Sequence, residues 1–61
     1  MDSIPKPHYT VPIVYSNQDF DEKSARRRVL MDHGLTWEAA GDRAAAEHDA
    51  AYDRYFKAGR P

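Results

Sequence analysis

His48, Asp49 and Tyr52 are the residues of this chain whose types and spacing could support chemistry. A histidine can act as a general base when its imidazole is neutral, a second group orients it and a nucleophile lies within reach. On a helix, His48 and Tyr52 would stand one turn apart, while Asp49 would be rotated from His48 by about 100°. We interpret His48 as an interface residue that is hydrogen-bonded to a tyrosine or to a backbone carbonyl, and we expect no catalytic residue.

The same region offers too few ligands for a metal ion. Asp49 and Asp53 would share one helix face, but the spacing of the sequence provides no further ligand beside them. Calcium takes about six to eight oxygen ligands. Because the chain has no cysteine, disulfides and thiolate metal sites are excluded as well. We expect neither a metal nor a cofactor.

These residues belong to a segment that is predicted to form one long helix over about 37–58. Thr36 is a suitable N-cap, because its hydroxyl can accept a hydrogen bond from an N–H group of the first turn. Glu38 near the start and Lys57 near the end complement the helix dipole. The many alanines favour a helix, and Gly59 is predicted to end it.

One side of this helix is predicted to be a packed stripe that is small in its middle and aromatic at both ends. The stripe comprises Trp37, Ala40, Gly41, Ala44, Ala45, His48, Ala51, Tyr52, Tyr55 and Phe56. Small residues let another backbone come close, so we expect a second helix to cross near 41–45. Gly41 is the one residue that disfavours the helix, by about 1 kcal/mol relative to alanine.

Charged residues form two edges beside the stripe. An acidic ridge of Glu38, Asp42, Asp49 and Asp53 flanks it on one edge. Arg43, Arg54 and Lys57 lie toward the other edge, and Glu47 is four residues from Arg43, where an ion pair is worth a few tenths of a kcal/mol. The acidic ridge is either an ordinary solvated face or a surface for a basic partner.

A shorter helix is predicted over about 20–33. Ser16, Asn17 or Asp19 in the preceding turn could cap its start. Acids come early in this helix and basic residues later, which suits the helix dipole. Gly34 is predicted to end it, and the link to the long helix is so short that the two helices must form a tight αα-corner or hairpin.

Arg26, Arg27 and Arg28 form a basic run in the shorter helix. Three consecutive residues spread over about 200° of a helix, so they cannot all face one phosphate-binding surface. The acidic ridge also makes the long helix a poor fit for a DNA groove. Nucleic acid is therefore not an expected partner, although a small DNA-binding or antitoxin-like regulator is an alternative class.

The first 17 residues are predicted to be an extended arm. Tyr9, Val11, Ile13 and Tyr15 alternate with other residues in the period-two pattern of a strand. Pro12 cannot donate a ladder hydrogen bond, so such a strand would lie at an edge. The arm either packs across the helices of its own chain or adds as an edge strand to the sheet of another molecule.

The predicted fold is therefore all-α, with the arm over 1–17 and a helical hairpin over 18–61 in a single small domain. A chain of 61 residues is near the size at which one hydrophobic core is only marginally stable, and it carries four tyrosines, two phenylalanines and one tryptophan. Some of these rings are expected to face a partner. The predicted partner-binding residues are Trp37, Gly41, Ala44, His48, Tyr52, Tyr55 and Phe56 of the long helix and Tyr9, Ile13 and Tyr15 of the arm.

Charge and hydropathy exclude other classes. The net charge of −1 gives no general attraction to nucleic acid or to an anionic membrane. No apolar run approaches the roughly 20 residues that span a bilayer, and the first ten residues lack the pattern of a signal peptide. We expect a cytoplasmic protein without a membrane partner.

The segment 42–59 resembles the catalytic-helix motif of the phospholipase A2-like domain in parvovirus minor capsid proteins. The resemblance implies that His48 activates a water, that Asp49 holds a calcium ion and that Tyr52 supports the network. The glycine-rich calcium loop of that family is not matched by residues 20–33, and its second catalytic helix is not matched within these 61 residues. A degenerate phospholipase-like module is thus an alternative, and we do not expect lipase activity.

The favoured hypothesis is a small non-enzymatic module that binds another protein, either a second copy of itself or a larger complex. A regulator or an inhibitor, encoded by a phage or a plasmid and directed at a host or defence machine, fits a chain of this size.

Overall fold

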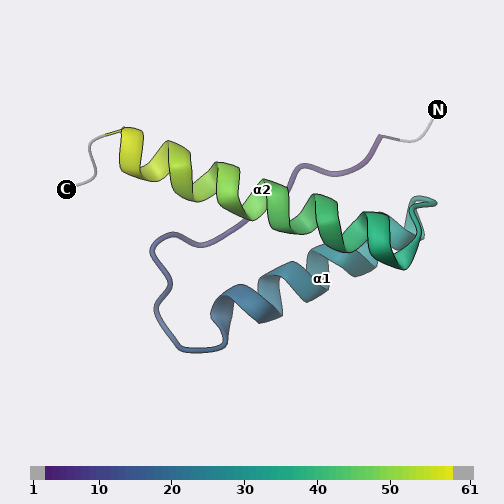
Figure 1. Cartoon of the computed structure of the whole chain (residues 1–61), viewed down its shortest axis with the longest axis horizontal. Coiled ribbons are helices and arrows are strands. Elements are labelled where there is room, and N and C mark those ends of the chain that lie inside the picture. Colours follow the sequence, from purple (N-terminus) through teal and green to yellow (C-terminus); the bar gives the residue numbers. More distant parts are fainter. Residues whose placement is uncertain (1–2, 59–61) are drawn as a thin grey trace.

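The computed structural model describes residues 3–58. It contains two helices, α1 over Gln18–Asp32 and α2 over Trp37–Lys57, which form a hairpin with the arm running beside them (Figure 1). The all-α prediction is confirmed. The described residues contain no strand, and the arm is extended without a sheet partner.

The first helix begins at Gln18 rather than at Phe20. Asn17 occupies the N-cap position without a capping hydrogen bond from its side chain, and Asp19, the third candidate, accepts from the Phe20 N–H of the first turn at 2.8 Å. Gln18 is buried instead, because its Oε1 accepts from the Val14 N–H at 2.6 Å and its Nε2 donates to the Thr10 carbonyl at 3.1 Å. These bonds to the arm order the first turn.

The end of α1 is formed by Gly34, as predicted. Gly34 has a φ of +106°, which side chains rarely adopt, and its N–H donates to the Met31 carbonyl at 3.0 Å. The last turn of α1 holds no basic residue, because the basic run lies in the middle of the helix. The arginines therefore do not stabilise the C-terminal end of the helix dipole.

The bounds of α2 agree closely with the prediction. The Thr36 hydroxyl accepts from the Ala39 N–H at 3.1 Å, Glu38 lies in the first turn, and Arg54 and Lys57 lie in the last. The helix ends at Lys57, and the predicted stop at Gly59 lies outside the described residues.

Between the helices lies a very small core. Leu30, Ala40 and Ala44 are the buried hydrophobic residues of the described part. Gln18, Arg26 and His48 are buried with them, so half of this interior is polar or charged. Packing on Ala40 and Ala44 confirms that the small middle of the stripe faces the partner helix.

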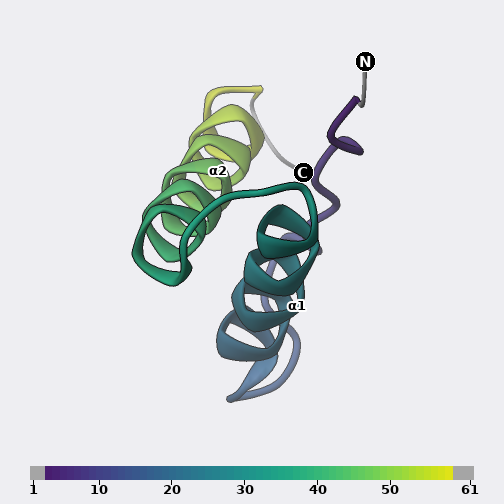
Figure 2. The ribbon, with the colours of Figure 1, turned by 90° about the vertical axis from the view of Figure 1, so that its right-hand side faces the viewer.

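The arm packs on the helices of its own chain. The Tyr9 hydroxyl donates to the Ala44 carbonyl at 3.0 Å, and the Thr10 N–H donates to Glu22 Oε1, also at 3.0 Å. Viewed along the helices, the arm covers one side of the pair (Figure 2). Tyr9 is half-buried, while Ile13 and Tyr15 are exposed. Of the two alternatives for the arm, the structure shows the intramolecular one.

Within residues 3–58, neither helix combines the length and the apolar character that spanning a membrane requires.

Candidate functional site

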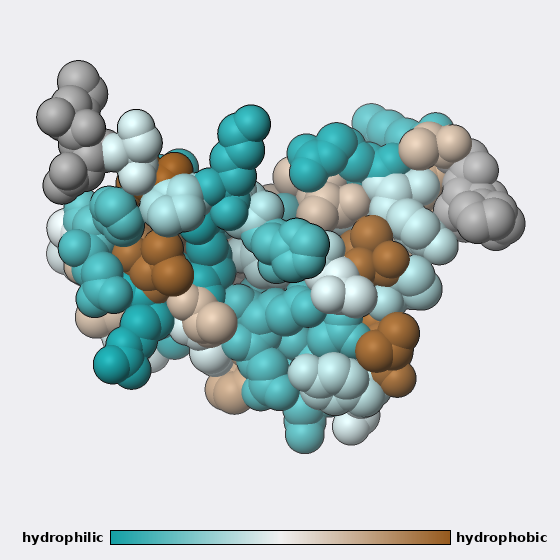
Figure 3. All heavy atoms as spheres, turned by 180° about the vertical axis from the view of Figure 1, so that it is seen from behind, coloured by the Kyte–Doolittle hydropathy of each residue, from teal (hydrophilic) through white to brown (hydrophobic). Residues whose placement is uncertain are grey.

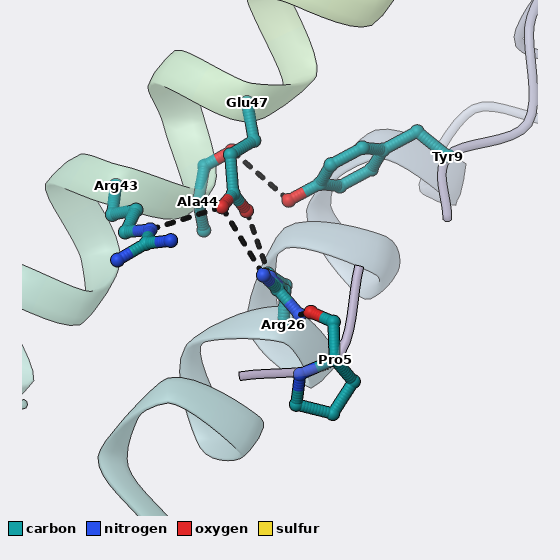
Figure 4. A network of polar contacts seen from close by, with 6 residues as sticks. All are labelled: Pro5, Tyr9, Arg26, Arg43, Ala44 and Glu47. Carbon is teal, nitrogen blue, oxygen red and sulfur yellow. Dashed lines mark hydrogen bonds and ion pairs between the residues drawn. The ribbon is translucent and has the colours of Figure 1, made fainter. Parts of the chain in front are cut away.

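A buried ion pair joins the two helices and the arm (Figure 4). Arg26 donates from Nε to Glu47 Oε1 at 2.7 Å and from Nη2 to Glu47 Oε2 at 3.1 Å. Its Nη1 donates to the Pro5 carbonyl at 2.6 Å. The side chains of Arg26 and Glu47 are 7% and 16% exposed, so this two-point pair is shielded from water.

Glu47 also accepts from Arg43 Nε at 3.1 Å, which is the ion pair predicted from the sequence. The hydrogen bond from Arg26, followed by the one from Arg43, lowers the pKa of Glu47 even though burial acts in the opposite direction. The pairing with Arg26 was not predicted, because Arg26 was interpreted only as part of a basic run. Its position one turn before the buried Leu30 is the signal that could have placed it inside.

The three consecutive arginines have different surroundings, as their spread around the helix predicts. Arg26 is buried, Arg28 is exposed, and the guanidinium of Arg27 lies 4.0 Å from the centre of the Trp37 ring. Such a cation–π contact contributes about 0.5–1 kcal/mol at an exposed site. No single face gathers all three charges.

Gly41 is explained by the side chain that lies over it. A Cβ at this position would stand 2.9 Å from Nε and 3.0 Å from Cζ of Arg27, and it would overlap Nη2. The missing side chain thus leaves room for a guanidinium between the Trp37 ring and the backbone of α2. The structure shows the close approach that was predicted near 41–45. At Gly41, however, the group that approaches α2 is the side chain of Arg27.

His48 is buried between two tyrosine rings. The rings of Tyr9 and His48 are nearly perpendicular, in an edge contact, and their centroids are 5.3 Å apart. The rings of His48 and Tyr52 are tilted against each other, and their centroids are 4.8 Å apart. His48 Nε2 has no hydrogen-bond partner among the described residues, and neither has the hydroxyl of Tyr52. The predicted hydrogen bond of His48 is therefore wrong. The nearby carbonyl of Ala44 is bound by Tyr9 instead.

This geometry limits the chemistry that His48 could perform. General base catalysis needs a water or a hydroxyl at a ring nitrogen, whereas Nε2 is buried and Nδ1 lies 3.9 Å from the exposed carboxylate of Asp49. In residues 3–58, no group of three or more His, Asp or Glu side chains is placed to hold a metal ion. The roles of His48, Asp49 and Tyr52 that the parvovirus resemblance implies stay a prediction.

The predicted partner-binding residues divide into two groups. Ala44 and His48 are buried and each contacts Tyr9 of the arm, so in this fold they pack within the chain. The exposed group consists of Trp37, Phe56, Ile13 and Tyr15. Gly41, Tyr52, Tyr55 and Tyr9 are half-buried, and Phe56 lies in ring contact with both Tyr52 and Tyr55.

Phe20 was missed as a surface residue, yet its side chain is 68% exposed. It borders a hollow of about 220 Å³ between the helices, lined by Phe20, Lys23, Ser24, Arg27, Gly41 and Ala45. At about 100° per residue, Phe20 and Met31 share one side of the helix, and Leu30 stands apart from them. That separation was the available signal.

All four residues of the acidic ridge are exposed. Asp53 pairs with Lys57 at 3.2 Å, whereas Glu38 and Asp42 form no ion pair with any described residue. The ridge therefore presents unneutralised carboxylates at the N-terminal half of α2.

Tyr9 gives the fold a dependence on alkaline pH. Burial, followed by the charge of Glu47, raises its pKa from 10.0 to about 12. Because the folded value is the higher one, the stability that Tyr9 contributes is complete below pH 10 and is lost as the pH rises toward 12. We expect the free energy of unfolding, measured in urea, to fall across this range, and Tyr9→Phe to remove much of the fall.

The matched control is Tyr15→Phe. Desolvation, followed by the charge of Asp21, raises the pKa of Tyr15 as well. This variant therefore measures how much of the loss of stability at alkaline pH comes from Tyr15. At neutral pH, Tyr9→Phe should be about 1 kcal/mol less stable, because the bond to Ala44 is lost. If the free energy of unfolding falls by the same amount at alkaline pH in Tyr9→Phe and in the wild type, Tyr9 is not the cause of the fall.

The sequence matches no family model, and neither a curated protein nor a solved structure matches it significantly. These comparisons therefore leave the parvovirus resemblance untested, and the function has to be argued from the geometry.

Proposed function

We propose that this chain is a small non-enzymatic protein-binding module that acts as a regulator or an inhibitor of a larger protein or complex. One observation carries the proposal: the described part exposes more large hydrophobic side chains than it buries. Leu30 is its one buried large hydrophobic residue. The exposed ones are Ile13, Val14, Tyr15, Phe20, Met31, Trp37 and Phe56. A partner that covers these side chains would remove their apolar surface from water.

The finer parts of the proposal rest on the sequence. A cytoplasmic inhibitor encoded by a phage or a plasmid fits the size and composition of the chain. The alternative of a DNA-binding regulator has less support, because Arg26 is bound to Glu47 inside the fold and the three consecutive arginines do not share one face. A single phosphate-binding surface cannot use all three charges.

Site-specific photocrosslinking in the native cell tests the proposal. A benzophenone amino acid at position 20 replaces one exposed aromatic ring with another, and the same probe at Ala46 serves as the control on a different exposed face. We expect crosslinked protein adducts from position 20 and far fewer from position 46. Equal crosslinking from the two positions, or none from position 20, would overturn the proposal.

A further inference from the structure

The two sides of the helix pair differ in what covers them. On one side the arm lies over α1, above a hollow of about 240 Å³ that Glu22, Ala25, Arg26 and Val29 line from the helix. The hollow of about 220 Å³ lies on the other side of α1 and shares none of these residues. We call this second side, centred on Phe20, Lys23, Ser24, Arg27, Gly41 and Ala45, the open face.

The arm side offers little continuous apolar surface. Seen from the back of Figure 1, where the arm crosses α2, hydrophobic residues form several small groups between hydrophilic ones (Figure 3). The open face instead holds the two most exposed aromatic rings, Phe20 at 68% and Trp37 at 59%. Between them lie Gly41 and Ala45, which carry minimal side chains, and the Arg27 side chain lies over Gly41.

Charges of opposite sign stand on the two rims of the open face. The basic residues Lys23 and Arg27 line the hollow from α1. Lys23 also lies 3.9 Å from Asp19 of the same helix, and Arg27 lies over Gly41. Glu38 and Asp42 project from α2, exposed and without an ion pair among the described residues. A two-fold axis parallel to the helices exchanges the rims, so the acidic rim of one copy would meet the basic rim of the other. The open face is complementary in charge to itself.

We propose that the open face binds a second copy of this chain about a two-fold axis, and that the two hairpins form a four-helix bundle. This inference rests on the proposed function and names the partner at one of its surfaces. Phe20 and Trp37 supply the apolar centre, and Glu38 and Asp42 pair with the partner's Lys23 and Arg27.

The test uses light scattering coupled to size exclusion, together with sedimentation, on three forms of the purified chain. The wild type is expected at about 14 kDa, twice the 7.0 kDa of one chain. One variant, Glu38→Lys with Asp42→Lys, makes both rims basic, and the other, Lys23→Glu with Arg27→Glu, makes both acidic. Each variant alone is expected to dimerise at least about tenfold more weakly, because like charges then face each other.

An equimolar mixture of the two variants decides the assignment. It is expected to form a heterodimer at least as tight as the wild-type dimer, because opposite charges meet again on both rims. This rescue also excludes unfolding as the cause of weak association, and circular dichroism of each variant checks the helix content. The inference would be overturned if either variant alone dimerised as tightly as the wild type. It would also be overturned if mixing the two variants did not restore dimerisation.

The inference and the proposed function can fail separately. A wild-type chain that stays at 7.0 kDa over the whole concentration range overturns the inference. If position 20 then crosslinks a different protein in the cell, the proposed function stands with another partner. If it crosslinks nothing, both are wrong.

Discussion

Replacing Glu47 with alanine is expected to cost about 3–5 kcal/mol of folding stability, because it leaves the buried guanidinium of Arg26 without its counter-charge. Both hydrogen bonds that Arg26 makes to α2 are lost, and the bond to the Pro5 carbonyl remains. A chain of this length has a total stability of about 3–9 kcal/mol. We therefore expect Glu47→Ala to be largely unfolded at 37 °C, as measured by circular dichroism and urea denaturation.

Arg43→Ala is the matched control. Arg43 bonds to the same carboxylate, but its side chain is 48% exposed, so its loss should cost less than about 1 kcal/mol. The pKa of Glu47 is lowered by folding, so its contribution is present at neutral pH and is lost as the pH falls through the lowered value. Glu47→Ala should lack this part of the acid transition. Equal losses from Glu47→Ala and Arg43→Ala would contradict the buried pair.

A double replacement separates the cost of an unpaired charge from the worth of the pair. Arg26→Met together with Glu47→Leu removes both charges and keeps apolar volume in the same place. Replacements of this kind are often neutral or stabilising elsewhere. We expect the double variant to be clearly more stable than Glu47→Ala. A double variant as unstable as Glu47→Ala would show that the ion pair itself holds the hairpin together.

Leu30→Ala is expected to cost about 2–5 kcal/mol, because it removes apolar atoms from a fully enclosed site and leaves a cavity. Leu30 is 0% exposed, and the buried hydrophobic residues beside it among those described are alanines, which have no longer side chain to fill the space. The expected loss is comparable with the whole stability of a chain this short. A broad or absent thermal transition is the predicted result.

The neighbouring Met31→Ala provides the comparison. Met31 is 41% exposed, so its truncation removes little buried area and should cost less than about 1 kcal/mol. Met31 is not in the core of the hairpin. Melting both variants at several protein concentrations also reports on association, because the melting temperature of an associating chain depends on its concentration. Similar losses from Leu30→Ala and Met31→Ala would mean that the hairpin does not pack around Leu30.

The sequence by itself determined the features that depend on neighbouring residues. Thr36 caps α2 and Gly34 ends α1, because capping hydrogen bonds and a positive φ are local matters. The spacing of Ala40 and Ala44 identified the packed side of α2, because every third or fourth residue of a helix shares a face. The tight link between the helices required an αα-corner or a hairpin, and the structure shows the hairpin (Figure 1).

Only the tertiary structure decided what the polar residues do. Arg26 and Glu47 are 21 residues apart, and Tyr9 and Ala44 are 35 apart, so no local pattern connects them. A charged residue in a helix is usually solvated, and the rule held for Arg28 but failed for Arg26. Arg26 is inside because the arm and α2 both bring acceptors to it. The reason is physical: capping and periodicity act between near neighbours, whereas the burial of a charge depends on which distant groups arrive to compensate it.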